Sequence, residues 1–102
     1  MKPNSQTIII SHAEAQTIQS YLDGTAGVQG SDRVISKTAV FPNGMEMDVK
    51  CCGSDTEASW AEAVLFDHGC EVYCTEPTEE FLGLWSIEYK GAKYEVTIAV
   101  EG

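Results

Sequence analysis

Residues 34–52, VISKTAVFPNGMEMDVKCC, decide the fold of this chain. The first part is rich in β-branched residues, and Pro42-Asn43-Gly44 then marks a tight turn. From residue 45 to residue 52, apolar residues alternate with charged ones, so that one side of the strand is apolar and the other is charged. The stretch therefore predicts a β-hairpin made of strands 34–41 and 45–52.

The same period of two continues toward the C-terminus. Strand pairs are predicted at residues 60–66 with 70–75, across Asp67-His68-Gly69, and at residues 84–89 with 93–100. The strand that begins at Trp60 has no clean apolar side, which predicts either a central strand or one at an interface between copies. Turn signals recur at the spacing of an antiparallel meander.

A helix is predicted before the hairpin. Residues 7–10 look like a short strand, and Ser11 with Glu14 three residues later forms the pattern of a capping box. The helix then covers residues 12–23, and residues 24–33 form a glycine-containing loop. We therefore expect an α+β fold in a single domain, residues 1–102. One N-terminal helix packs on an antiparallel meander sheet of five to six strands that spans residues 34–100.

Acidic charge is concentrated in residues 46–88. This stretch holds eleven acidic residues and one base, Lys50, whereas the rest of the chain holds five of each. The net charge of −10 argues against direct binding to nucleic acid or to anionic membranes, because no basic patch displaces counterions. Such a charge attracts basic protein surfaces, and the competing explanation is solubility alone.

No pattern in the sequence indicates catalysis or a cofactor. The glycines at residues 24, 27 and 30 follow a helix instead of linking a strand to one, and no nucleophile elbow or phosphate loop is present. Cys51 and Cys52 are adjacent, and Cys70 and Cys74 are four residues apart, so neither pair has the spacing of a zinc knuckle. We expect free, buried thiols, no metal and no enzyme activity. The chain has no apolar run of transmembrane length, which predicts a cytoplasmic protein.

Three segments carry a resemblance: FPNGMEMDVKCC (41–52), WAEAVLFDHGCEV (60–72) and LGLW (82–85), followed by Tyr94-Glu95-Val96. They are similar to small uncharacterised acidic proteins of phages, plasmids and conjugative elements of Gram-positive bacteria. The likeness covers about residues 40–100. It implies the class of small anti-defence proteins, anti-CRISPR inhibitors among them.

The leading hypothesis is a non-enzymatic inhibitor that occupies a basic nucleic-acid-binding surface, such as that of a CRISPR effector nuclease. Carboxylates two residues apart on a strand lie about 6.6 Å apart, a spacing on the scale of nucleic-acid phosphates. The expected partner-binding residues are Glu46, Asp48, Glu71, Glu76, Glu79, Glu80 and Glu88, with Phe81 as an exposed aromatic anchor. Two alternatives stay open. One is an oligomeric accessory module of a mobile element that associates through the Trp60 strand, and the other is a metal-binding domain that uses the thiols.

Overall fold

The computed structural model describes residues 4–22, 33–53 and 59–102, and these residues form seven strands and one helix. The elements, in chain order, are β1 (Ser5–Ile10), α1 (His12–Leu22), β2 (Arg33–Val40), β3 (Met45–Cys52), β4 (Trp60–Asp67), β5 (Cys70–Cys74), β6 (Gly83–Tyr89) and β7 (Ala92–Val100).

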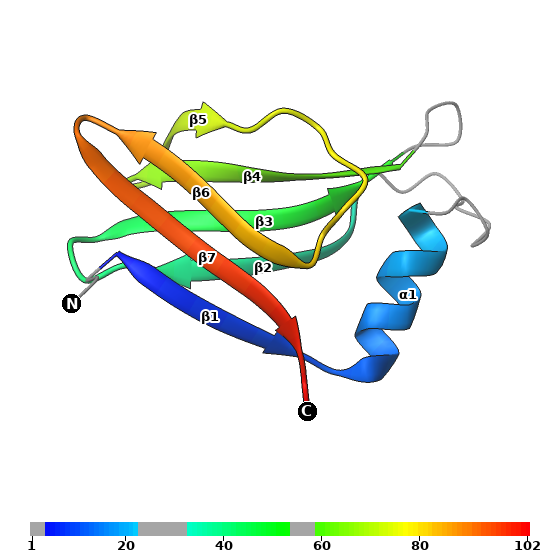
Figure 1. The fold of residues 1–102 in the computed structure, drawn as a ribbon. Helices are drawn as coiled ribbons and strands as arrows, with labels where there is room; N and C mark the ends of the chain where they lie inside the picture. The colour runs from blue at the N-terminus through cyan, green and yellow to red at the C-terminus, as the bar shows by residue number, and fades with distance from the viewer. Residues whose placement is uncertain (1–3, 23–32, 54–58) are drawn as a thin grey trace.

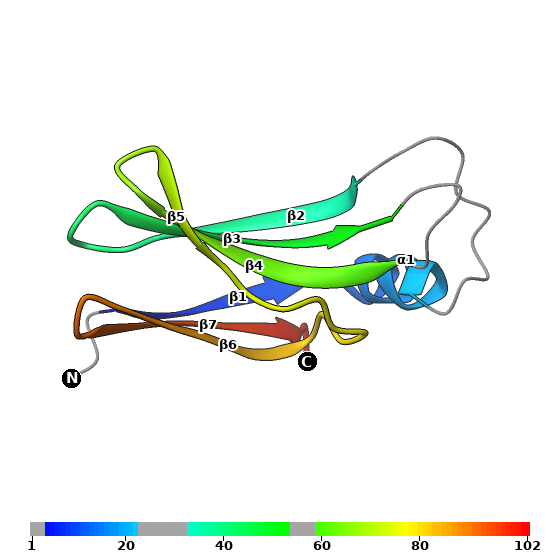
Figure 2. The ribbon, with the colours of Figure 1, turned by 90° about the horizontal axis from the view of Figure 1, so that it is seen from above.

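The strands form two sheets (Figure 1). One has three strands in the order β1-β7-β6, in which β1 runs parallel to β7 and β6 runs antiparallel to it. The other has the order β2-β3-β4-β5 and is antiparallel throughout. Figure 2 shows the two sheets as separate layers, with α1 at one end of them.

The α+β class is confirmed, but the predicted layout is wrong in two respects. β1, the short strand expected before the helix, pairs with the last strand, Ser5 with Glu95, so the strands do not form one meander. The apolar sides of the two sheets face each other, and the helix lies at the end of the layers instead of covering a sheet (Figure 2). Alternation identifies the apolar side of each strand, but it does not identify the element that covers that side.

The core lies between the two layers. β3, β4, β6 and β7 supply most of it, through Met45, Met47, Val49, Cys51, Ala61, Ala63, Leu65, Trp85, Ile87, Tyr94, Val96 and Ile98. The rings of Phe41 and Tyr94 pack in an edge-on arrangement, with centroids 5.2 Å apart. The amide of Asn43 donates a hydrogen bond to the Tyr94 hydroxyl at 3.0 Å. These two contacts join the β2–β3 turn to the three-stranded sheet.

The helix start and the two tight turns form as the sequence predicts. The backbone N–H of Glu14 donates to Ser11 Oγ at 3.1 Å, and the N–H of Ser11 donates to Glu14 Oε1 at 3.3 Å, which completes the capping box. The turns His68-Gly69 and Lys90-Gly91 have positive φ at both residues, as two-residue hairpin turns require. Nearly all of the expected 24–33 loop lies outside the described residues.

The strand with the mixed pattern, β4, is central, as predicted. It lies between β3 and β5, and its inner side carries Ala61, Ala63 and Leu65. Val64 is on the outer side and is still only 1% exposed. Because β3 and β5 occupy both edges of β4, a second copy of the chain cannot extend the sheet there.

Candidate functional site

Residues 75–82, which we call the crossing segment, carry the chain from one sheet to the other. The segment first continues beside β4: the N–H of Thr75 donates to the carbonyl of Ala63 at 2.9 Å, and the N–H of Thr78 donates to the carbonyl of Ala61 at 2.9 Å. The Thr75 hydroxyl also accepts a hydrogen bond from the N–H of Ala63 at 2.9 Å. Pro77 fits this position because an edge strand tolerates a residue without an N–H.

Two contacts hold the far end of the crossing segment. Phe81 is 1% exposed and belongs to the core cluster. Its carbonyl accepts a hydrogen bond from the Trp85 indole N–H at 2.8 Å. The prediction of Phe81 as an exposed anchor is therefore wrong, because the chain must turn its apolar side inward here to enter the second sheet. Leu82, the next residue, is exposed at 42%.

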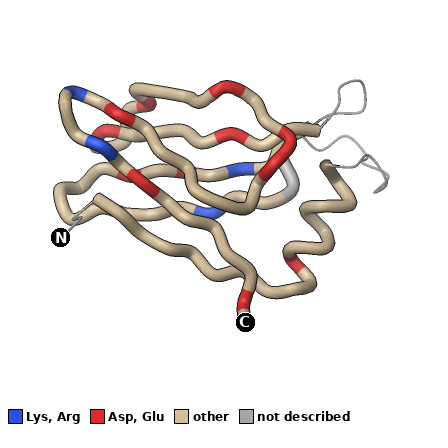
Figure 3. Tube along the Cα trace, viewed as in Figure 1, with Lys and Arg blue, Asp and Glu red and all other residues tan. Residues whose placement is uncertain are grey.

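Four of the predicted carboxylates line this side of the molecule. Glu71 on β5 and Glu76, Glu79 and Glu80 on the crossing segment are all exposed, and we call them the acidic edge. Among the described residues, the ion pairs are Lys37 with Glu14, Lys50 with Glu62 and His68 with Asp67, so none includes these four. Figure 3 shows acidic positions along β5 and the crossing segment. Within the ranges that the structure describes, the backbone therefore presents four charges that take part in no ion pair.

The other three predicted carboxylates lie on β3 and β6. Glu46 and Asp48 are on the outer side of β3, where Asp48 accepts hydrogen bonds from the hydroxyls of Ser36 and Thr38. Glu88 is on the outer side of β6, in the other layer, and is paired in register with Lys93. Glu46 and Glu71 are both in register with Phe66, so they share the outer side of the four-stranded sheet with Asp48. Glu88 does not belong to this face, because the outer sides of the two sheets face in opposite directions.

Sequence reasoning missed the residues that position the acidic edge. Thr75 and Thr78 fix one end of the crossing segment through hydrogen bonds to β4, and Trp85 of β6 fixes the other end by donating to the Phe81 carbonyl. Pro77 indicates that the crossing segment lies at the edge of a sheet. No local pattern identifies β4 as the strand beside it.

The four cysteines divide into two pairs. Cys51 and Cys52 are buried, as predicted, whereas Cys70 and Cys74 on β5 are exposed, so the prediction of buried thiols is wrong for these two. The short β5 strand lies at the outer edge of its sheet, where solvent reaches both sulfurs. No group of three or more His, Cys, Asp or Glu residues in the described ranges is arranged to hold a metal ion.

Cys74 belongs to a small polar cluster on the outer side of the four-stranded sheet. Its thiol donates to Glu62 Oε2 at 3.1 Å, and the Trp60 indole N–H donates to the other oxygen of Glu62 at 2.6 Å. Partial burial raises the pKa of the Cys74 thiol to about 11, and the hydrogen bond to Glu62 and the negative charges of Glu62 and Glu71 contribute. The thiol stays protonated near neutral pH, which makes it a poor nucleophile or metal ligand.

This cluster gives a prediction about thiol reactivity. At pH 8, iodoacetamide should modify Cys74 slowly although its side chain is exposed, and the rate should rise as the pH approaches the thiol pKa of about 11. The E62Q variant lowers that pKa by removing the negative charge, so it should react faster at pH 8. Peptide mapping by mass spectrometry measures the rates, with Cys70 as the internal reference. An unchanged Cys74 rate in E62Q would contradict the electrostatic explanation.

No family model, curated protein sequence or solved structure shows a significant match to this chain. The resemblance to small acidic proteins of mobile elements thus stays a prediction. None of the described helical residues forms a helix that is long and apolar enough to cross a membrane.

Proposed function

We propose that this protein is a non-enzymatic binding protein that docks its acidic edge on a basic, nucleic-acid-binding protein surface. Glu71, Glu76, Glu79 and Glu80 are all exposed, form no ion pair within the described part of the chain, and sit on a backbone held by hydrogen bonds. The proposal rests on this observation. Nucleic-acid-binding surfaces are rich in Lys and Arg, so carboxylates at fixed positions compete there with phosphates.

Inhibition by this route needs no chemistry. The protein occupies the basic surface and excludes DNA or RNA by volume and by charge. The resemblance of residues 40–100 to small acidic proteins of mobile elements implies the anti-defence class. This favours a nuclease as the partner, and a CRISPR effector with its guide RNA is the first to test. This function does not involve the cysteines.

The test is a DNA-cleavage assay with a purified Gram-positive CRISPR nuclease, guide RNA and increasing amounts of this protein. The double charge reversal E71K/E76K should raise the concentration for half-inhibition at least tenfold, since like charges placed in contact cost several kcal/mol. Higher salt should weaken inhibition by the wild type, because the contacts are between exposed charges.

A matched control separates the acidic edge from net charge. The variant S5K/T7K/A13K/Q16K changes the net charge by the same four units, at exposed positions on β1 and α1. It should inhibit almost as well as the wild type. If both variants lost inhibition equally, only the total charge would matter. If the wild type inhibited none of a panel of basic nucleases, the proposal would be overturned.

A further inference from the structure

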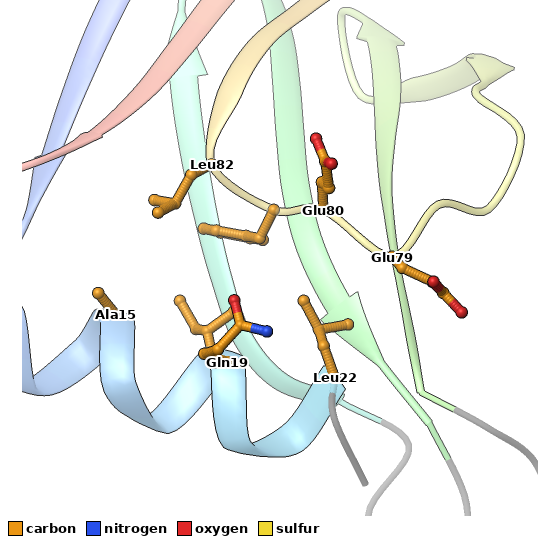
Figure 4. A pocket seen from close by; sticks show the side chains of 8 residues that line it. Ala15, Gln19, Leu22, Glu79, Glu80 and Leu82 are labelled. Carbon is orange, nitrogen blue, oxygen red and sulfur yellow. The ribbon is translucent and has the colours of Figure 1, made fainter.

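A groove with an apolar floor and a partly polar wall lies directly beside the acidic edge, between α1 and the crossing segment (Figure 4). Its volume is about 660 Å³, within the range of ligand-binding clefts. Four residues of α1 and four of the crossing segment line it: Ala15, Ile18, Gln19, Leu22, Glu79, Glu80, Phe81 and Leu82.

The floor of the groove is part of the core, and its walls are partly exposed. Ile18 and Phe81, at the floor, are 3% and 1% exposed and belong to the core. Ala15 and Leu22 lie one helical turn to either side of Ile18 and are only half-buried, and Leu82 on the opposite wall is exposed. The helix sits at the end of the two layers, where Ile18 and Tyr21 reach the core while Ala15 and Leu22 stay partly exposed. Apolar surface of this kind gains about 25 cal/mol per Å² when a partner removes it from water.

The charge at the rim selects among the possible occupants. Glu79 and Glu80 flank the groove on the crossing segment, and no Lys or Arg is among its lining residues. Figure 4 shows both carboxylates directed away from the helix, outside the groove. An apolar group can therefore enter the groove while cationic groups on either side of it meet the rim. A second copy of this chain would bring the same carboxylates to the contact and be repelled.

We propose that the groove receives an apolar side chain from a segment of the partner protein, in which Lys or Arg residues flank that side chain. This inference rests on the proposed function, because it supplies the apolar contact for the same acidic edge. It also reverses the role expected from the sequence: Phe81 does not insert into the partner but forms the floor on which the anchor of the partner packs. An apolar anchor surrounded by polar contacts is the usual arrangement of an interface hot spot.

The probe is a fluorescein-labelled peptide, Lys-Arg-Ser-Leu-Phe-Ser-Arg-Lys, and its control has Ser in place of Leu and Phe at the same charge. Fluorescence anisotropy should show that the wild type binds the apolar peptide at least tenfold more tightly than the control. Backbone amide shifts in NMR should change at Ala15, Leu22 and Leu82. Equal affinity for the two peptides, or shifts confined to other residues, would overturn the inference.

Variants of the protein test the location. A15F fills the groove and should remove the preference for the apolar peptide while the control peptide still binds. If A15F fails to fold, L82S removes one wall at an exposed position and should reduce the preference at least threefold. E79Q/E80Q should weaken both peptides more than E71Q/E76Q, which removes the same charge outside the groove. A preference that survives the groove variants would exclude this site.

The two proposals can fail separately. Equal binding of both peptides, with inhibition that still depends on Glu71 and Glu76, would overturn the groove and leave the acidic edge. Tight binding of the apolar peptide in the groove, with nuclease inhibition unaffected by E71K/E76K, would overturn the acidic edge and leave the groove.

Discussion

Replacing Phe81 with alanine should lower the free energy of unfolding by about 3–5 kcal/mol. The side chain is 1% exposed and packs in the core where the chain crosses between the sheets, so its removal leaves a cavity. The loss is a large part of the stability of a typical domain, about 5–15 kcal/mol. Urea unfolding followed by tryptophan fluorescence measures the change through the transition midpoint.

The adjacent residue provides the control for this variant. Leu82 is exposed, and L82A should change the stability by less than about 1 kcal/mol. If F81A kept the wild-type midpoint and lost binding to the partner, Phe81 would be an exposed anchor and its place in the core would be wrong. A loss of stability together with weaker binding is expected, because the crossing segment also positions Glu79 and Glu80.

Phe41→Ala should have an effect of similar size, about 3–5 kcal/mol, for a different reason. Phe41 is 2% exposed and its ring contacts Tyr94 of the opposite sheet, so the variant loses both buried area and an aromatic pair worth about 0.5–1.5 kcal/mol. Because this contact joins the two layers, F41A should lower the urea midpoint of both sheets equally. The fluorescence of Trp60 reports on one sheet and that of Trp85 on the other.

Val40 is the matched control for Phe41. It precedes Phe41 directly and is exposed at 56%, so V40A should cost less than about 1 kcal/mol. Separate transitions for Trp60 and Trp85 in F41A would show that the sheets unfold independently, and this would contradict a shared core.

The acidic edge was only partly predictable. Exposure of Glu71, Glu76, Glu79 and Glu80 follows from their charge, because isolated carboxylates are rarely buried. Their grouping does not follow from charge, because it depends on the hydrogen bonds of Thr75 and Thr78 to β4. The groove beside them was not predictable either, since it forms between α1 and a segment about sixty residues later in the chain.

The sequence by itself determined the local structure of this protein. The capping box of Ser11 and Glu14, the positive-φ turns and the alternating sides of the strands all depend on residues a few positions apart. Only the tertiary structure decided how these elements combine. Alternation shows which side of a strand is apolar, and it applies equally to a sheet covered by a helix and to one covered by another sheet. In this protein β1 pairs with β7, and the resulting sheet covers the other sheet. Glu46 and Glu88 therefore lie on opposite outer sides, and Phe81 lies in the core.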